Sequence, residues 1–162
     1  MATGIDTLIS PAMVEAKGRW SEVRVSPPIS PSDIRRWAIA TYWPQTPPPL
    51  YWDEAYAQTT RWGAIIAPPD FNPFAWPVRR TPPPAAAPPA GGVRLTAMNG
   101  GQTDSFGVPM RAGDVIFARS RLSDFNERQG RFGLMLYSYT EILWTNQNDE
   151  FVRRRIATSI RY

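Results

Sequence analysis

Hydrophobic and polar residues alternate near the C-terminal end of the chain. In residues 151–162, one face carries Val152, Ile156, Thr158, Ile160 and Tyr162, and the other carries Arg153, Arg155 and Arg161. A period of two residues predicts a β-strand with one buried face. Residues 132–145 are rich in aromatic and aliphatic side chains on both faces, which is typical of a central strand.

Two further strands are expected before these. Residues 115–122 follow the turn at 112–114, and residues 93–98 end at Asn99-Gly100-Gly101. The connections at 127–130 and 146–149 are short and turn-like, so successive strands are expected to be antiparallel neighbours. All 18 prolines lie at or before Pro109, and a proline-free segment is where a sheet is expected.

The front half of the chain has the spacing of helices. Ser30 precedes Pro31, and Asp33 lies near the positive end, which together predict a helix start. Beyond this start, one helix face carries Ile34, Trp37, Ala38 and Thr41. Residues 20–25 are expected to add an edge strand ahead of this helix.

Two more short helices are expected after the first. One spans about residues 53–62 and stops at Gly63. The other opens at Pro68-Pro69-Asp70, and Pro73 and Pro77 limit it to a few turns.

Residues 81–92, TPPPAAAPPAGG, form an uncharged segment of low complexity. We expect either a disordered insert or a flap over a pocket. It does not resemble a domain linker, because neither flank could bury a core without the other. The sequence therefore predicts one α+β domain over residues 1–162, with a helical layer packed on an antiparallel sheet.

The composition removes several classes of enzyme. The chain has no cysteine and no histidine, which excludes disulfides, thiolate nucleophiles, imidazole bases and zinc sites that contain histidine. Lys17 is the only lysine, which argues against a Schiff-base enzyme. Arginines run at 35–36, 79–80 and 153–155, where they either cover a solvated surface or form an anion site. We find no continuous basic stripe with a nucleic-acid-reading motif, so no nucleic-acid partner is expected.

The N-terminal residues predict the location of the protein. Residues 1–20 carry acids and lack a basic start followed by an apolar run, so no signal peptide is expected. No stretch approaches the ~20 apolar residues of a membrane span. A cytoplasmic protein is therefore expected.

Several separated motifs follow one another in an order that points to a family. They are residues 49–57 (PLYWDEAYA), 61–63 (RWG), 65–69 (IIAPP), 99–102 (NGGQ), 109–114 (PMRAGD) and 145–147 (TNQ). Together they resemble the N-terminal domain of MaoC-like, fatty-acid-synthase-type dehydratases over roughly residues 18–162. The resemblance implies a hot-dog fold, in which an antiparallel sheet wraps around a helix, and pairing into a double hot dog.

The resemblance also locates the catalytic positions. Active hydratases of this family carry an Asp-x-Asn-Pro-Leu-His segment, whose aspartate and histidine activate or deliver water across the double bond of a 2-enoyl thioester. When Pro49-Leu50 is aligned with that segment, Thr46 stands for the aspartate, Pro48 for the asparagine and Tyr51 for the histidine. Threonine and an unperturbed tyrosine are poor bases near neutral pH. The catalytic pair of the family is therefore absent from this chain.

Three functions follow from this resemblance. The first is a non-catalytic, substrate-binding or scaffolding subunit of a heteromeric enoyl-CoA hydratase or dehydratase. Such a subunit pairs with a histidine-bearing MaoC-type hot-dog subunit, with itself, or with both, and its ligand is an acyl-CoA or acyl-carrier thioester without another cofactor. The alternatives are a self-sufficient hydro-lyase or thioesterase that uses a carboxylate such as Asp70, and a homodimeric acyl-thioester binding protein.

Candidate substrate-binding residues lie in two segments. Ala67 to Phe71, at the expected start of the third helix, could polarise a thioester carbonyl, or the segment forms a tight structural turn. Within it, Asp70 either acts in a pocket or caps the helix. Asn99 and Gln102 either hold a polar group of the substrate or belong to a turn at the end of a strand.

Aromatic and basic residues supply the other candidates. Trp43, Trp52 and Trp76 either line an apolar tunnel or belong to the core or a dimer interface. Arg79, Arg80 and Arg111 are candidates for binding the phosphates of coenzyme A, unless they only cover the surface.

Overall fold

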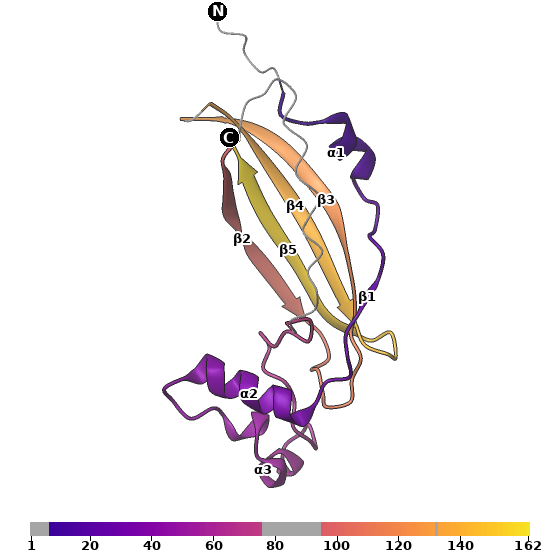
Figure 1. Cartoon of the computed structure of the whole chain (residues 1–162), viewed down its shortest axis with the longest axis vertical. Helices are drawn as coiled ribbons and strands as arrows, with labels where there is room; N and C mark the ends of the chain where they lie inside the picture. Colours follow the sequence, from indigo (N-terminus) through magenta and orange to yellow (C-terminus); the bar gives the residue numbers. More distant parts are fainter. Residues whose placement is uncertain (1–6, 76–94, 132) are drawn as a thin grey trace, which may run out of the picture.

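The computed structural model describes residues 7–75, 95–131 and 133–162. The low-complexity segment 81–92, together with Trp76, Arg79 and Arg80, lies outside the described residues. Figure 1 shows the arrangement of the rest, with four long strands side by side and α2 and α3 gathered at one end of the sheet.

The sheet has five strands in the order β1-β3-β4-β5-β2. They are β1 (Arg24–Val25), β2 (Ala97–Phe106), β3 (Phe117–Gly130), β4 (Gly133–Thr145) and β5 (Phe151–Arg161). Every neighbouring pair is antiparallel, and the short connections correctly predicted that β3 and β4, and β4 and β5, are neighbours. The consecutive strands β2 and β3 are not neighbours, because β2 pairs with β5. The expected edge strand at 20–25 is present as the two-residue β1.

The C-terminal ends of two strands, β2 and β3, were wrongly predicted. Each strand contains a β-bulge and continues beyond it. The turn expected at 127–130 is part of β3, where Glu127 pairs with Leu136 and Gly130 with Gly133, beyond a bulge between Leu122 and Asp124. Asn99-Gly100-Gly101 does not end a strand either. Asn99 pairs with Ser159 and Gln102 with Ala157, so one extra residue is accommodated inside β2. The bulge requires glycine at Gly101, whose φ is 97°.

The helices are α1 (Pro11–Ala16), α2 (Pro31–Tyr42) and α3 (Glu54–Thr59), with a 3₁₀ turn η1 (Pro49–Tyr51) between α2 and α3. Ser30 caps α2 as predicted, because its Oγ accepts from the backbone N–H of Asp33 at 3.1 Å. The second helix is shorter than expected and ends at Thr59. The third does not form in the described part of 68–77, where residues 69–70 and 73–74 are turns.

One hydrophobic core joins the helical end to the sheet. It contains Ile29, Ile34, Ala57, Ile65, Ala67, Phe71, Met110, Ile116, Ala118, Trp144 and Val152. Two edge-to-face ring contacts lie in this region: Trp37 meets Phe71 at 5.6 Å, and Phe74 meets Trp144 at 5.4 Å between ring centroids. These contacts anchor α2 and the 65–75 segment against the lower part of β4.

Two carboxylates on the sheet each hold two arginines. Asp104 binds Arg153 and Arg155, and Glu141 binds Arg121 and Arg154. The alternation in 151–162 predicted that Arg153 faces away from the buried face, and this is wrong because Arg153 is only 6% exposed. Its guanidinium is neutralised by Asp104 and lies 5.1 Å from the Trp144 ring centroid, so burial is compensated.

The two edges of the sheet differ in their backbone hydrogen bonding. Residues 7–26 run along the outer edge of β3, where Gly18 donates to Leu122 O at 2.8 Å and Ser21 to Ser120 O at 2.8 Å. Farther along, the backbone N–H groups of Leu8 and Ile9 donate to the carboxylate of Glu127. On the other side, β2 pairs only with β5 among the described residues, and nine of its ten residues are exposed. Over residues 7–75, 95–131 and 133–162, the sheet therefore has one closed edge, beside β3, and one open edge, at β2.

Replacing Glu141 tests how far the ion clusters stabilise the sheet. Burial raises the pKa of Glu141, but hydrogen bonds and charges from Arg121 and Arg154 outweigh it and hold the pKa below its ordinary value of 4.5. A lowered pKa means that the contribution to stability is complete above about pH 4.5 and is lost as the pH falls through the folded-state pKa. We expect Glu141→Gln to lower the free energy of unfolding at pH 7 by about 1–3 kcal/mol in urea titrations.

The difference between wild type and Glu141→Gln should shrink on acidification. Glu15→Gln is the control, because that carboxylate is exposed and pairs with the exposed Arg19, so little change is expected. Equal stability of wild type and Glu141→Gln at pH 7 would show that the cluster contributes nothing.

Candidate functional site

The segment that aligns with the catalytic motif of the family lies between α2 and α3. Thr46 is exposed, and Tyr51 ends η1, where its backbone N–H donates to Pro48 O at 3.1 Å. The Tyr51 ring lies 6.0 Å from that of Tyr42, at the last turn of α2. Burial raises the pKa of Tyr51 to about 12, with help from a hydrogen bond to Tyr42 and from the charges of Tyr42 and Asp70. Tyr51 is therefore a neutral phenol at physiological pH.

Asp70 is the acidic residue of this region. It is exposed on the turn at 69–70, and its charge contributes to the raised pKa of Tyr51. Tyr42 completes the group and was not predicted. Its position next to Thr41 on the predicted helix face was the available signal.

The segment from Ala67 to Phe71 is a turn, and its backbone donors are largely used. Ala67 donates to Met110 O at 2.8 Å, Phe71 donates to Pro68 O at 2.9 Å, and the two intervening prolines have no N–H. Of the two interpretations, the structure forms the tight turn, and no helix starts here in the described residues. Phe71 is buried against Trp37, which gives it a structural contact.

Asn99 and Gln102 lie on β2 and make local hydrogen bonds. The Asn99 side chain accepts from the Gly101 N–H at 2.8 Å, which shapes the bulge. The Gln102 amide donates to Asp104 at 3.2 Å. Both residues lie in the first part of β2, which begins at the end of the sheet far from α2 and α3 (Figure 1). The structure does not bring them to Tyr51.

The tryptophan and arginine candidates differ in their surroundings. Trp43 and Trp52 are exposed near η1, and the Trp52 indole donates to Pro47 O at 2.9 Å. Arg111 is half-buried and donates to Trp62 O at 2.8 Å, which ties the loop after α3 to the connection between β2 and β3. Arg111 thus has a structural contact in addition to its predicted role in binding phosphate.

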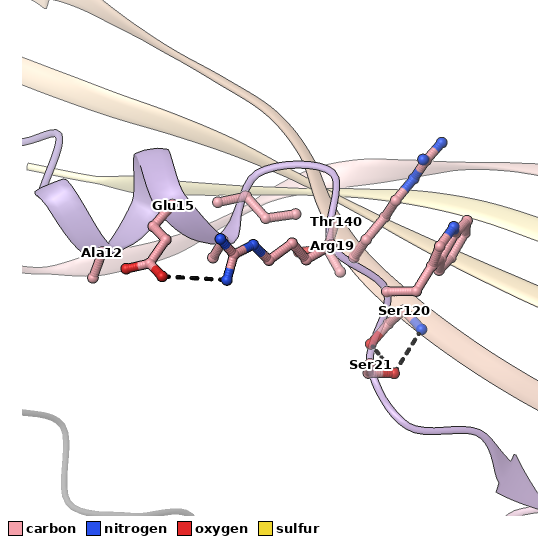
Figure 2. Close-up of a pocket in the computed structure, with 10 residues that line it drawn as sticks. Ala12, Glu15, Arg19, Ser21, Ser120 and Thr140 are labelled. Atoms are coloured by element: carbon pink, nitrogen blue, oxygen red, sulfur yellow. Dashed lines mark hydrogen bonds and ion pairs between the residues drawn. The ribbon is translucent and has the colours of Figure 1, made fainter.

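A hollow on the described surface lies elsewhere. It has a volume of about 490 Å³ and lies between α1 and the closed edge of the sheet. Figure 2 shows the Glu15–Arg19 ion pair and the hydrogen-bonded Ser21 and Ser120 along it. None of the predicted site residues lines it. Helix α1 was not predicted, although Ser10-Pro11 repeats the start pattern of Ser30-Pro31.

The chain forms a long antiparallel sheet in the order β1-β3-β4-β5-β2, and α2 and α3 lie between β1 and β2 along the chain. This arrangement is the hot-dog fold. Residues 15–155 match the family described as "FAS1-like, dehydratase domain region", and the chain belongs to this family. The predicted relationship to fatty-acid-synthase-type dehydratases is thereby confirmed. None of the curated proteins compared with the chain matches it.

Solved structures of low sequence identity share the fold. The ChsH1-ChsH2 complex from Mycobacterium tuberculosis contains a chain with a TM-score of 0.70 and 18% identity, covering 92% of this chain and 88% of that one. A chain of the HadBC (3R-hydroxyacyl-ACP dehydratase) complex from the same organism gives 0.60 and 19%, with coverage of 90% and 96%. The MaoC-like dehydratase from Rhodospirillum rubrum gives 0.58 and 18%, with coverage of 86% and 89%.

Among the described residues, no helix is long and apolar enough to cross a bilayer.

Arg111→Ala tests the structural contact of Arg111. Loss of the charged donor leaves the Trp62 carbonyl without this partner, so the free energy of unfolding should fall by about 1–2 kcal/mol in urea titrations. Arg36→Ala, which removes an exposed arginine on α2, should leave the stability nearly unchanged. If both variants are as stable as wild type, the contact with Trp62 does not hold the loop.

Proposed function

We propose that this protein is a non-catalytic, substrate-binding subunit of a heteromeric enoyl-thioester hydratase or dehydratase. The observation that carries the proposal is the state of Tyr51, which occupies the aligned position of the catalytic histidine. It is a partly buried phenol with a pKa of about 12, and the chain has no histidine to replace it.

Hydration of a 2-enoyl thioester needs two proton transfers. A base takes a proton from the attacking water, and an acid protonates the α-carbon. Both groups work best with a pKa near the working pH. Tyr51 keeps its proton at neutral pH, and the hydroxyl of Thr46, at the position of the aspartate, is not a base in this range. Neither residue can perform the role of the group that it replaces.

A catalytic partner would supply the missing pair. Both complexes with the same fold, ChsH1-ChsH2 and HadBC, contain two kinds of subunit, as their names state. Within the described ranges, β2 has a strand neighbour on one side only and offers backbone N–H and C=O groups to a further strand, whereas the β3 edge is occupied by residues 7–26. We propose pairing with a histidine-bearing MaoC-type subunit, with an acyl group carried as a coenzyme A or acyl-carrier thioester and without another cofactor.

A second candidate function rests on Asp70. This exposed carboxylate acts electrostatically on Tyr51, so a base and a phenol lie near each other beside the aligned segment. On this alternative, the chain is a self-sufficient hydro-lyase or thioesterase in which Asp70 takes the proton from water.

The hydration rate of the purified chain separates these functions. We expect it not to hydrate 2-enoyl-CoA at the rate of a working enzyme, because the loss of a positioned acid–base group costs about 10²–10⁴-fold. Addition of a histidine-bearing MaoC-type subunit should restore the rate, which is followed by the loss of enoyl-thioester absorbance. The restored rate should depend on the histidine of that subunit.

Two variants of this chain complete the test. In the mixture, Tyr51→Phe should change the rate only modestly, because the phenol does not transfer protons. Fast turnover by the isolated chain that is abolished by Asp70→Asn would contradict the proposal and establish the alternative.

A further inference from the structure

The turn from Ala67 to Phe71 has few backbone donors left for a thioester carbonyl. Ala67 and Phe71 use their N–H groups inside the protein, and the two prolines between them have none. We propose that the side chain of Tyr42 donates the hydrogen bond to the thioester carbonyl of a bound acyl group, and that Tyr51 positions Tyr42 for this role. The inference rests on the substrate-binding function proposed above and adds a binding residue that lies outside the aligned motif.

Tyr42 and Tyr51 come from two elements that meet beside the aligned segment. Tyr42 is the last residue of α2, and Tyr51 is the last residue of η1. Their ring centroids lie 6.0 Å apart, with an angle of 42° between the ring planes. Both residues are half-buried, so the protein holds each side chain without removing it from the surface.

The hydrogen bond between the two phenols has a direction. It raises the pKa of Tyr51. A hydrogen bond has this effect when the titrating phenol is the donor, because deprotonation removes the donor. Tyr51 therefore donates and the Tyr42 oxygen accepts, which leaves the proton of Tyr42 for another acceptor.

The Tyr42 proton has no acceptor among the residues that the structure describes. Asp70 raises the pKa of Tyr51 through its charge and not through a hydrogen bond. Within residues 7–75, 95–131 and 133–162, the Tyr42 hydroxyl forms no hydrogen bond other than the one with Tyr51. A half-buried hydroxyl in this state is available to an acceptor on a ligand.

A phenol suits the carbonyl oxygen of a thioester. That oxygen carries only lone pairs, and a neutral phenol donates to it without bringing a charge into the site. Because Tyr42 also accepts from Tyr51, its O–H group is polarised and its own hydrogen bond becomes stronger. A donor that is already in place also stabilises negative charge that develops on the carbonyl oxygen. Tyr42 thus orients the acyl group, while the partner subunit performs the proton transfers.

Two coenzyme A ligands separate recognition of the carbonyl from binding of the rest of the molecule. Hexanoyl-CoA contains the thioester carbonyl, whereas a methylene group replaces it in S-hexyl-CoA. We expect calorimetry of the full chain to show that wild type binds hexanoyl-CoA about two- to tenfold more tightly, as one neutral hydrogen bond provides. Tyr42→Phe should bind the two ligands equally, and Tyr51→Phe should keep part of the preference.

The infrared band of the bound thioester carbonyl tests the positioning role of Tyr51. A hydrogen bond to the carbonyl lowers its stretching frequency, so wild type should shift the band from its position in free hexanoyl-CoA. The shift should be lost in Tyr42→Phe and reduced in Tyr51→Phe, because the latter keeps the donor and loses the group that polarises it. An equal shift in wild type and Tyr51→Phe would overturn the role of Tyr51.

Tyr56→Phe is the matched control, because it removes a phenol that is 47% exposed on α3. It should keep the wild-type preference for hexanoyl-CoA. A preference that persists in Tyr42→Phe, that is absent from wild type, or that Tyr56→Phe also abolishes would overturn the inference. Fast hydration of 2-enoyl-CoA by the isolated chain would overturn the proposed function instead, and the comparison of thioester with thioether would still test Tyr42.

Discussion

The rest of the structure depends on a difference in backbone pairing between the two edges of its sheet. Residues 7–26 cover the outer side of β3 with backbone hydrogen bonds, whereas β2 has a strand neighbour on one side only in the part of the chain that the structure describes. A sheet edge with unpaired groups is either protected or used. In the function proposed above, a partner subunit pairs at the β2 edge, where the bulge between Asn99 and Gln102 interrupts a regular ladder.

The local chemistry at Tyr51 agrees with dependence on a partner. The phenol is partly buried near Tyr42 and Asp70, and its pKa of about 12 keeps it protonated. This arrangement can donate a hydrogen bond or pack against a ligand, but it cannot supply the base that hydration requires. The hot-dog fold is present, and the function proposed above assigns the acid–base chemistry to a partner subunit.

Features fixed by neighbouring residues were predictable from the sequence, and features fixed by distant contacts were not. Helix α2 was predicted because its start depends on Ser30 and Asp33, three residues apart. The extension of β2 through Gly100 depends on β5, where a Cβ on Gly100 would lie 2.7 Å from the Thr158 side chain. The turn at Ala67 depends on Met110, and the burial of Arg153 depends on Asp104. In the candidate site, the aligned position of Tyr51 could be read from the motif, but its contact with Tyr42 required the fold.

The central claim is that the chain works through a catalytic partner that joins its open edge. Hydrogen exchange of the backbone amides in residues 97–106, measured with and without the histidine-bearing MaoC-type subunit, tests this directly. The account predicts that β2 amides exchange more slowly in the mixture, while amides of β3 beside residues 17–25 change little. Unchanged exchange in β2 in a mixture that hydrates 2-enoyl-CoA would contradict it.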